Sequence, residues 1–204
     1  MIPSKYIENA VNEMASLPGV GKRTALRYIL DIIGRSDEDV ERFIKSLAEL
    51  KANIRTCSQC HNLSDRELCD ICTNPSRDKS TVCVVEDIRD VMAIEATHQY
   101  KGLYHVLGGK ISPMDGIGPG DLEVGSLLER MNKGEFTEVI LALSSTMEGD
   151  TTAYFIFKKL DKFDNLVTTT LSRGVPIGDE LQYTDEVTLG RSIIQRTPYD
   201  QSLQ

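Results

Sequence analysis

The sequence has 204 residues, of which 40% are hydrophobic, and this composition is typical of one large globular domain or two or three small ones. It has no apolar segment long enough to cross a membrane, and residues 1–20 lack the basic start and apolar stretch of a signal peptide, so we expect a cytoplasmic protein. The net charge of −8 excludes general attraction to nucleic acid. Because residues 81–204 carry the acidic excess, with 11 Lys and Arg against 19 Asp and Glu, any DNA contact must be local.

Three amphipathic helices are predicted in residues 1–56. Apolar residues recur at helical spacing over residues 7–15 and 26–33, and Leu-Pro-Gly-Val-Gly-Lys-Arg-Thr-Ala lies between them. A third helix is expected to begin after Ser36 and to run, as plain scaffold, to Ile54. The first two helices and their Gly-x-Gly turn resemble the helix-hairpin-helix motif, which binds the DNA backbone in repair proteins.

The Gly-x-Gly turn is the candidate DNA-binding site. Gly19 and Gly21 permit a tight turn whose amides face outward at the start of the next helix, an arrangement that binds phosphate. Lys22 and Arg23 would add positive charge without reading any base, so the contact would be independent of sequence. The alternative is a plain connector between two core helices, or a contact with another protein.

Four of the five cysteines form two Cys-x-x-Cys pairs separated by eight residues: Cys57, Cys60, Cys69 and Cys72. Two such pairs supply the tetrahedral thiolate ligands of zinc, and the short polar segment between them offers little to bury, so the metal would be structural. Four thiolates leave no open position for a catalytic water. The alternatives are two disulfides, which a reducing compartment disfavours, or a redox pair. We exclude His61 from the ligands because four thiolates already fill the coordination shell.

A mainly parallel sheet is predicted after the cysteines. Apolar, β-branched runs at residues 81–85, 138–143 and 166–171 read as strands, and the second is followed by helical spacing through Leu160. This order of elements predicts an α/β fold with helices on both faces of the sheet. The segment 104–120 is rich in Gly and Pro and is expected to be a binding loop, not part of the core.

Three acidic residues follow two of these strands: Glu86, Glu148 and Asp150. If the strands are neighbours, the carboxylates meet at one edge and form an oxygen site suited to Mg²⁺. The arrangement resembles the Toprim domain of topoisomerases, bacterial primases and certain nucleases, in which a glutamate is followed by Asp-x-Asp. Here the second motif reads Glu-x-Asp, and the longer side chain disturbs the octahedral geometry that Mg²⁺ requires. The alternatives are ordinary acids at strand ends, or a docking site for a basic partner protein.

The last part of the chain reads as a docking segment, with a turn Arg-Gly-Val-Pro-Ile-Gly from residue 173 and a short helix through Ile194. The expected organisation is a multi-domain α/β protein with four parts. These are a helix-hairpin-helix domain at 1–56, a four-cysteine zinc module at 57–72, a Toprim domain at 80–175 and a C-terminal docking segment at 176–204.

These motifs, with Tyr-His-Val-Leu-Gly-Gly at 104–109 and Asp-Gly-Ile-Gly-Pro at 115–119, together resemble the RecR family of bacterial recombination proteins. The resemblance covers nearly the whole chain. It implies a mediator without chemistry of its own that acts with RecO or RecF to help load RecA onto single-stranded DNA. It also implies homo-oligomers, dimers or ring tetramers, that encircle DNA in the bacterial cytoplasm, associated with the nucleoid.

The competing hypothesis is a Mg²⁺-dependent Toprim nuclease or phosphotransferase that uses the three carboxylates. A topoisomerase also needs a tyrosine nucleophile, and none of the seven tyrosines has a flanking motif that distinguishes it. A primase needs nucleotide-handling domains for which the chain has no room. The absence of a second catalytic element therefore favours the non-catalytic hypothesis.

Overall fold

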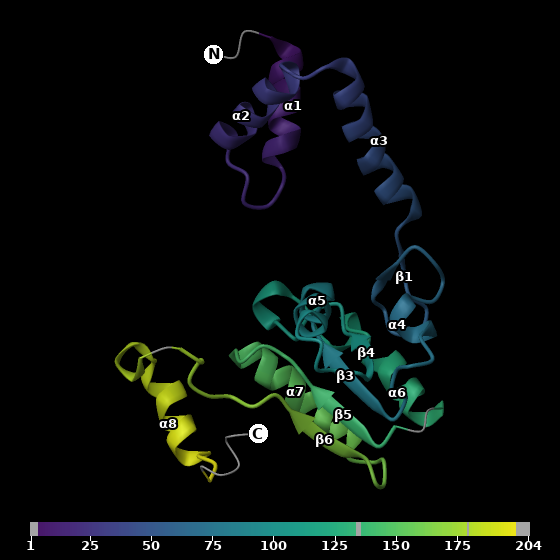
Figure 1. The fold of residues 1–204 in the computed structure, drawn as a ribbon, viewed down its shortest axis with the longest axis vertical. Helices are drawn as coiled ribbons and strands as arrows, with labels where there is room; N and C mark the ends of the chain where they lie inside the picture. Colours follow the sequence, from purple (N-terminus) through teal and green to yellow (C-terminus); the bar gives the residue numbers. More distant parts are fainter. Residues whose placement is uncertain (1–3, 134–135, 179, 199–204) are drawn as a thin grey trace. The chain divides into compact units, whose positions relative to one another are not determined.

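The computed structural model describes residues 4–133, 136–178 and 180–198 (Figure 1). The chain divides into two compact units, Met1–Ile54 and Arg55–Gln204. Within the described ranges, no helix is both long and apolar enough to span a bilayer.

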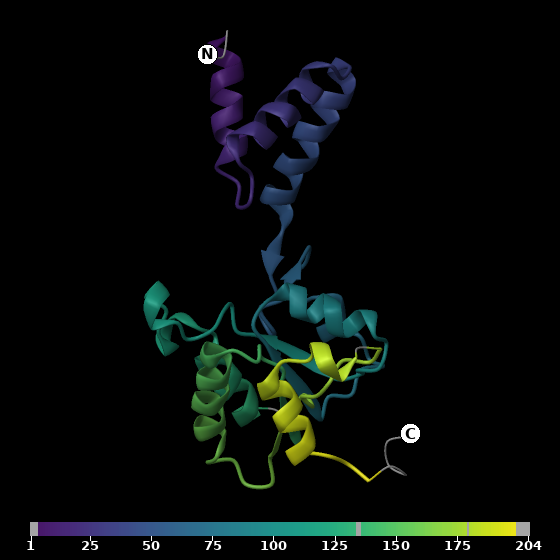
Figure 2. The same ribbon diagram turned by 90° about the vertical axis from the view of Figure 1, so that its left-hand side faces the viewer.

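The first unit contains three helices: α1 (Lys5–Ala15), α2 (Lys22–Ile33) and α3 (Asp37–Asn53). Helices α1 and α2 pack side by side, as both ribbon views show (Figures 1 and 2). Their apolar faces meet in a small core in which Val11, Ala25 and Ile29 are buried. The predicted pair of helices is therefore confirmed, with the turn at residues 16–21 between them.

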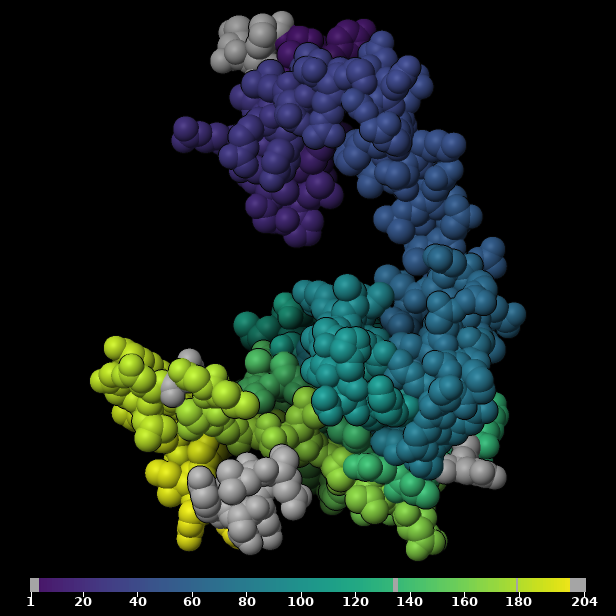
Figure 3. Space-filling view, viewed as in Figure 1, coloured from purple at the N-terminus to yellow at the C-terminus, as the bar shows by residue number. Residues whose placement is uncertain are grey.

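Helix α3 begins where the sequence indicates, because the Ser36 side chain accepts a hydrogen bond from the Asp39 amide at 3.2 Å. None of its described residues is buried. Its atoms lie at the surface along its length in the space-filling view (Figure 3). The large apolar side chains that remain exposed lie along one side of the helix and are Phe43, Ile44, Leu47 and Leu50. The prediction of plain scaffold thus omitted an apolar surface.

The second unit opens with the cysteine module. Strands β1 (Arg55–Thr56) and β2 (Leu63–Ser64) form an antiparallel pair, and the short helix α4 (Asp70–Thr73) follows. Ile71 of α4 packs into one side of the main core, so the module lies against the sheet.

The sheet has four parallel strands in the order β4-β3-β5-β6. The strands are β3 (Thr81–Val85), β4 (Leu103–Val106), β5 (Glu138–Leu141) and β6 (Val167–Thr170). The helices are α5 (Ile88–Ala96), α6 (Val124–Lys133), α7 (Met147–Leu160) and α8 (Glu186–Ile194).

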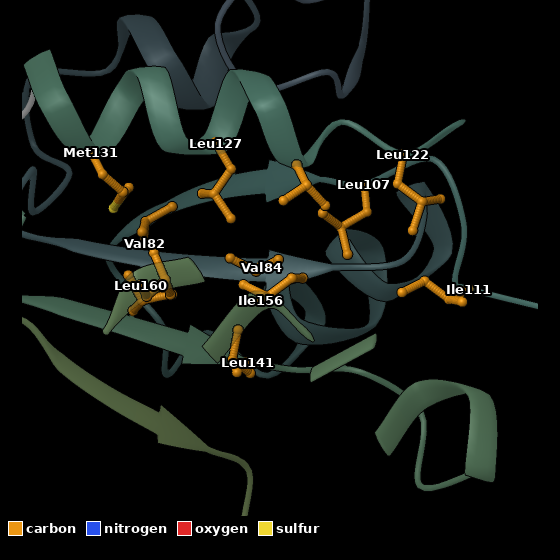
Figure 4. Packing of buried hydrophobic residues seen from close by; sticks show 12 residues of the cluster. Val82, Val84, Leu107, Ile111, Leu122, Leu127, Met131, Leu141, Ile156 and Leu160 are labelled. Atoms are coloured by element: carbon orange, nitrogen blue, oxygen red, sulfur yellow. The ribbon is translucent and has the colours of Figure 1, made fainter. Parts of the chain in front are cut away.

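The side chains of the central strand β3 point alternately to the two faces of the sheet, so the core has two layers. Val82 and Val84 face α6 and α7, where they meet Leu127 and Ile156 (Figure 4). The intervening Cys83 and Val85 point to the other side, where α5 covers the sheet. The predicted parallel sheet with helices on both faces is confirmed.

Strand β4 overlaps the first residues of the segment 104–120 that we expected to be a loop. Its four residues are all buried, and they pair with β3 in register. The segment after Leu107 is irregular, with left-handed backbone at Gly108 and two short 3₁₀ turns, Pro113–Asp115 and Pro119–Asp121. The glycines and prolines therefore mark a loop that begins at Leu107, three residues later than the sequence suggested.

Candidate metal and nucleic-acid sites

The four predicted cysteines converge. Their sulfur atoms all lie within 4.8 Å of one another. In the described part of the chain, they form the one group of three or more His, Cys, Asp or Glu side chains whose ligand atoms meet. His61 is not a member of this group. Cys57 and Cys60 come from the loop after β1, Cys69 precedes α4 and Cys72 lies within it.

The thiols are free, and their spacing suits a metal better than a disulfide. The Cys60 and Cys69 sulfurs are 3.5 Å apart and those of Cys57 and Cys72 are 3.9 Å apart, far longer than an S–S bond. The hydrogen bond between the two sulfurs raises the pKa of Cys60 and lowers the pKa of Cys69. A bound Zn²⁺ would replace the thiol protons and make all four thiolates stable.

The backbone holds the module in shape and joins it to the sheet. The Cys57 amide donates to the Asn62 carbonyl at 2.7 Å, and His61 adopts a left-handed φ of 62° that turns the chain after Cys60. The Val106 amide of β4 donates to the Cys60 carbonyl at 2.8 Å. The cysteine module therefore covers part of the edge of the sheet that β4 forms.

The four predicted DNA-binding residues lie together in the turn between α1 and α2. Gly19 has a φ of +77°, which favours glycine, and Gly21 is the N-cap of α2. Because Gly21 has no capping side chain, the first amides of α2 are available to an anion. Lys22 and Arg23 are exposed, and within the described residues neither forms an ion pair. The turn thus combines free amides with free positive charge.

The three carboxylates lie at the carboxyl ends of neighbouring strands, as expected, but they do not form one converging cluster. Glu86 follows β3, and its Oε1 accepts a hydrogen bond from the Ser144 amide at 2.7 Å, which ties the ends of β3 and β5 together. Glu148 and Asp150 lie in the first turn of α7, where the helix dipole favours negative charge. Each carboxylate therefore has its own local setting.

Two cations that the sequence did not single out pair with these acids. Lys110 Nζ lies 3.9 Å from Glu148 Oε2 and donates to Thr146 Oγ1 at 3.2 Å. Arg173 donates to both oxygens of Asp150, at 2.5 and 3.3 Å, and it holds the pKa of Asp150 below its usual range. Lys110 comes from the loop after β4. Because β4 was not predicted as a strand, the position of Lys110 near Glu148 could not be predicted either.

Comparison with known proteins gives four matches along the chain. The family models are the RecR helix-hairpin-helix at residues 7–51, the RecR four-cysteine zinc finger domain at 54–74, the Toprim domain at 80–170 and the RecR C-terminal segment at 174–197. The protein named recombination protein RecR of Phocaeicola vulgatus is 60% identical over 195 residues, which is 96% of this chain and 95% of that protein. The proteins of the same name from Bacteroides fragilis and Flavobacterium johnsoniae are 57% and 52% identical, over 97% and 98% of this chain and 96% and 97% of theirs.

The chain belongs to the RecR family. Its four converging cysteines lie within the match to the family's four-cysteine zinc finger, and the donor set, burial and spacing all fit structural zinc. The zinc, when bound, holds the loop between Cys57 and Cys72 in place of a hydrophobic core. Residue 179 and residues 199–204 of the expected docking segment lie outside the described residues.

Proposed function

We propose that the chain is a DNA-binding recombination mediator without catalytic activity, which acts with RecO or RecF to help load RecA onto single-stranded DNA at the nucleoid. The observation that carries this proposal is the turn of residues 19–23, with uncapped amides beside two cations that form no ion pair among the described residues. Its relatives are named recombination proteins, which supports a role on DNA. Contacts to phosphates alone make the binding independent of sequence.

The test of the DNA site is the double variant Lys22→Ala, Arg23→Ala. Both side chains would neutralise phosphates. We therefore expect the negative slope of log affinity against log salt to become shallower by about two in the variant. The matched control is Arg42→Ala, Lys45→Ala, which removes the same charge from the side of α3 opposite its exposed apolar residues and is expected to change the slope little. An unchanged affinity in the Lys22 and Arg23 variant at moderate salt would falsify the turn as the DNA site.

The proposal includes self-association, in dimers or ring tetramers. It is supported by the exposed apolar side of α3, where the exposed fractions of Phe43, Ile44, Leu47 and Leu50 run from 39% to 59%. Light scattering of Ile44→Asp, Leu47→Asp should report a smaller particle than the wild type. The control Lys45→Asp changes the net charge by the same two units on the opposite side of the helix and should leave the particle unchanged. An unchanged particle in both variants removes α3 from the interface.

The acidic edge is assigned to docking of a basic partner, not to phosphodiester cleavage. Two of its three carboxylates already pair with Lys110 and Arg173, so a divalent ion would have to displace a cation from each. The Glu148→Lys, Asp150→Lys variant should slow association with RecO most at low salt and leave DNA binding by the turn intact. Asp161→Lys, Asp164→Lys is the control for total charge. If the wild type cleaves DNA with Mg²⁺ and the first variant does not, the Toprim enzyme hypothesis replaces this one.

A further inference from the structure

Arg130 of α6 is a cation without an anionic partner among the described residues. Its Nη1 donates to the Tyr104 carbonyl at 2.7 Å and to His105 Nδ1 at 3.0 Å. Its Nε and Nη2 are shielded from water, and neither has a hydrogen-bond partner in the described part of the chain. A guanidinium held this way is costly unless a nearby negative charge compensates it.

The cysteine module is the neighbouring group that can carry negative charge. Burial lowers the pKa of Arg130, and negative charge on the cysteines opposes that shift. Ser58 and Gln59, the two residues between Cys57 and Cys60, line the same cavity of about 690 Å³ as Arg130. The Phe136 ring lies 5.6 Å from the guanidinium carbon. Arg130 thus borders a cavity that residues of the metal loop also line.

Two histidines complete the connection between α6 and the metal loop. His105 Nε2 lies 2.7 Å from the Glu123 carbonyl, to which it must donate, so its Nδ1 is left to accept from Arg130. Burial keeps His105 neutral by lowering its pKa to about 3. His61, next to Cys60, packs edge-on against the His105 ring with centroids 5.2 Å apart. The contacts run without a gap from Arg130 to the residue beside a zinc ligand.

We propose that Arg130 is the counter-charge of the zinc centre and positions the metal loop against the sheet. Zn²⁺ with four thiolates keeps a net negative charge, and the guanidinium is a charge of the opposite sign held on α6. Groups outside the first coordination shell commonly orient and stabilise the ligands in this way. The packing of α6 on β4 and the occupancy of the metal site are then linked, because each stabilises the other.

The experiment measures Zn²⁺ affinity by competition with a chelator in the full-length chain. Arg130→Met should weaken Zn²⁺ binding about tenfold to a hundredfold, the range found when such outer groups are removed. In the Co²⁺-loaded protein, the same variant should shift the thiolate-to-metal absorption bands. Arg130→Lys keeps the charge but not the two hydrogen bonds of Nη1, and is expected to lie between Arg130→Met and the wild type.

The matched control is Arg77→Met, which removes another partly buried arginine of the same unit that pairs with Glu95. A purely structural role would make both variants less stable with unchanged Zn²⁺ affinity. Our proposal requires that only Arg130→Met lowers the affinity for Zn²⁺. It also requires that Arg130→Met lowers the melting temperature less in the zinc-free protein than in the zinc-loaded protein. Zn²⁺ affinity equal to that of the wild type, or of Arg77→Met, overturns it. If Arg130→Met does not fold, unchanged Zn²⁺ affinity and Co²⁺ bands in Arg130→Lys overturn it equally.

Discussion

Arg77, Glu95 and Tyr104 form a polar network that joins three separate elements. Arg77 precedes β3, and it binds both oxygens of Glu95 on α5, with one bond of 2.9 Å. The Tyr104 hydroxyl of β4 donates to the same carboxylate at 2.8 Å. The side chains of Arg77 and Glu95 are only 12% and 31% exposed, so this ion pair is shielded more than a surface pair.

Replacing Glu95 with glutamine should lower the free energy of unfolding by about 1 to 3 kcal/mol, because Arg77 is left partly buried without its charge partner. The guanidinium of Arg77 holds the pKa of Glu95 below its usual range. The ionised pair is therefore present in full above the pKa of free glutamate, about 4.3, and is lost as pH falls further. Urea unfolding of the wild type and of Glu95→Gln at several pH values tests this. The difference between their free energies of unfolding should be constant from pH 7 to 5 and should become smaller below about pH 4. A constant difference at all pH values would contradict the ionic origin.

Some site residues could be predicted from the sequence because they belong to local motifs, whereas others could not because they depend on contacts between distant residues. Cys57, Cys60, Gly19 and Gly21 belong to local spacings whose chemistry can be read directly. Lys110 and Arg173 take their positions from partners 36 and 23 residues away, which only the folded chain brings near. Such pairings depend on tertiary packing and leave no periodic trace in one sequence.

At the scale of elements, the start of α7 is constrained by its approach to the loop after β5. A Cβ atom on Gly149 would lie 2.0 Å from the Ser144 carbonyl oxygen and 2.7 Å from its hydroxyl. The Gly149 amide donates to Thr146 Oγ1, which caps the helix. The glycine thus lets α7 begin directly at the acidic edge.

Gly149→Ala should therefore lower the free energy of unfolding by about 1 to 3 kcal/mol or more, since α7 must move away from Ser144. Gly125→Ala is the matched control in α6, where an added Cβ meets no atom within 4 Å. It should raise stability by about 0.5 to 1 kcal/mol, the usual gain from replacing a helical glycine. Denaturant unfolding measures both, and equal stability of Gly149→Ala and the wild type would show that α7 does not approach Ser144 this closely.

The elements themselves were predictable to different degrees. The runs at 81–85 and 138–143 are apolar and β-branched, and the strands Thr81–Val85 and Glu138–Leu141 formed there. Strand β4, Leu103–Val106, reads Leu-Tyr-His-Val, with two polar-tipped residues in its middle and a pair of glycines, Gly108 and Gly109, soon after its end. Both can be buried because Tyr104 bonds Glu95 and His105 bonds Glu123, so hydropathy alone could not indicate a fully buried strand.

At the scale of the whole molecule, the division at Ile54 predicts that metal loss acts on one unit only. Removing zinc should free the loop of residues 57–72 and release the edge of β4, because the Val106 amide donates to the Cys60 carbonyl. Hydrogen exchange should speed up over 57–72 and 103–107 and stay unchanged over 5–33. Faster exchange in the last range would mean that the helical unit depends on the metal.

Assembly should determine how strongly the protein binds DNA. Each chain offers one turn with the cations Lys22 and Arg23, while the chain as a whole carries a net charge of −8 that repels DNA. When several turns bind one DNA molecule, each further contact forms at a high effective concentration. The overall affinity for DNA then rises by about 100-fold or more.

The Ile44→Asp, Leu47→Asp variant, which should not assemble, is therefore expected to bind DNA about 100-fold more weakly although Lys22 and Arg23 are intact. Its salt dependence should also be shallower, because fewer phosphates are neutralised per complex. Titration of labelled DNA at several salt concentrations, with particle mass measured in parallel, tests both effects. Lys45→Asp, which makes the same change in net charge on the opposite side of α3, controls for the added negative charge. Wild-type affinity in a variant that light scattering shows to be a single chain would mean that one turn suffices, and that assembly serves another purpose.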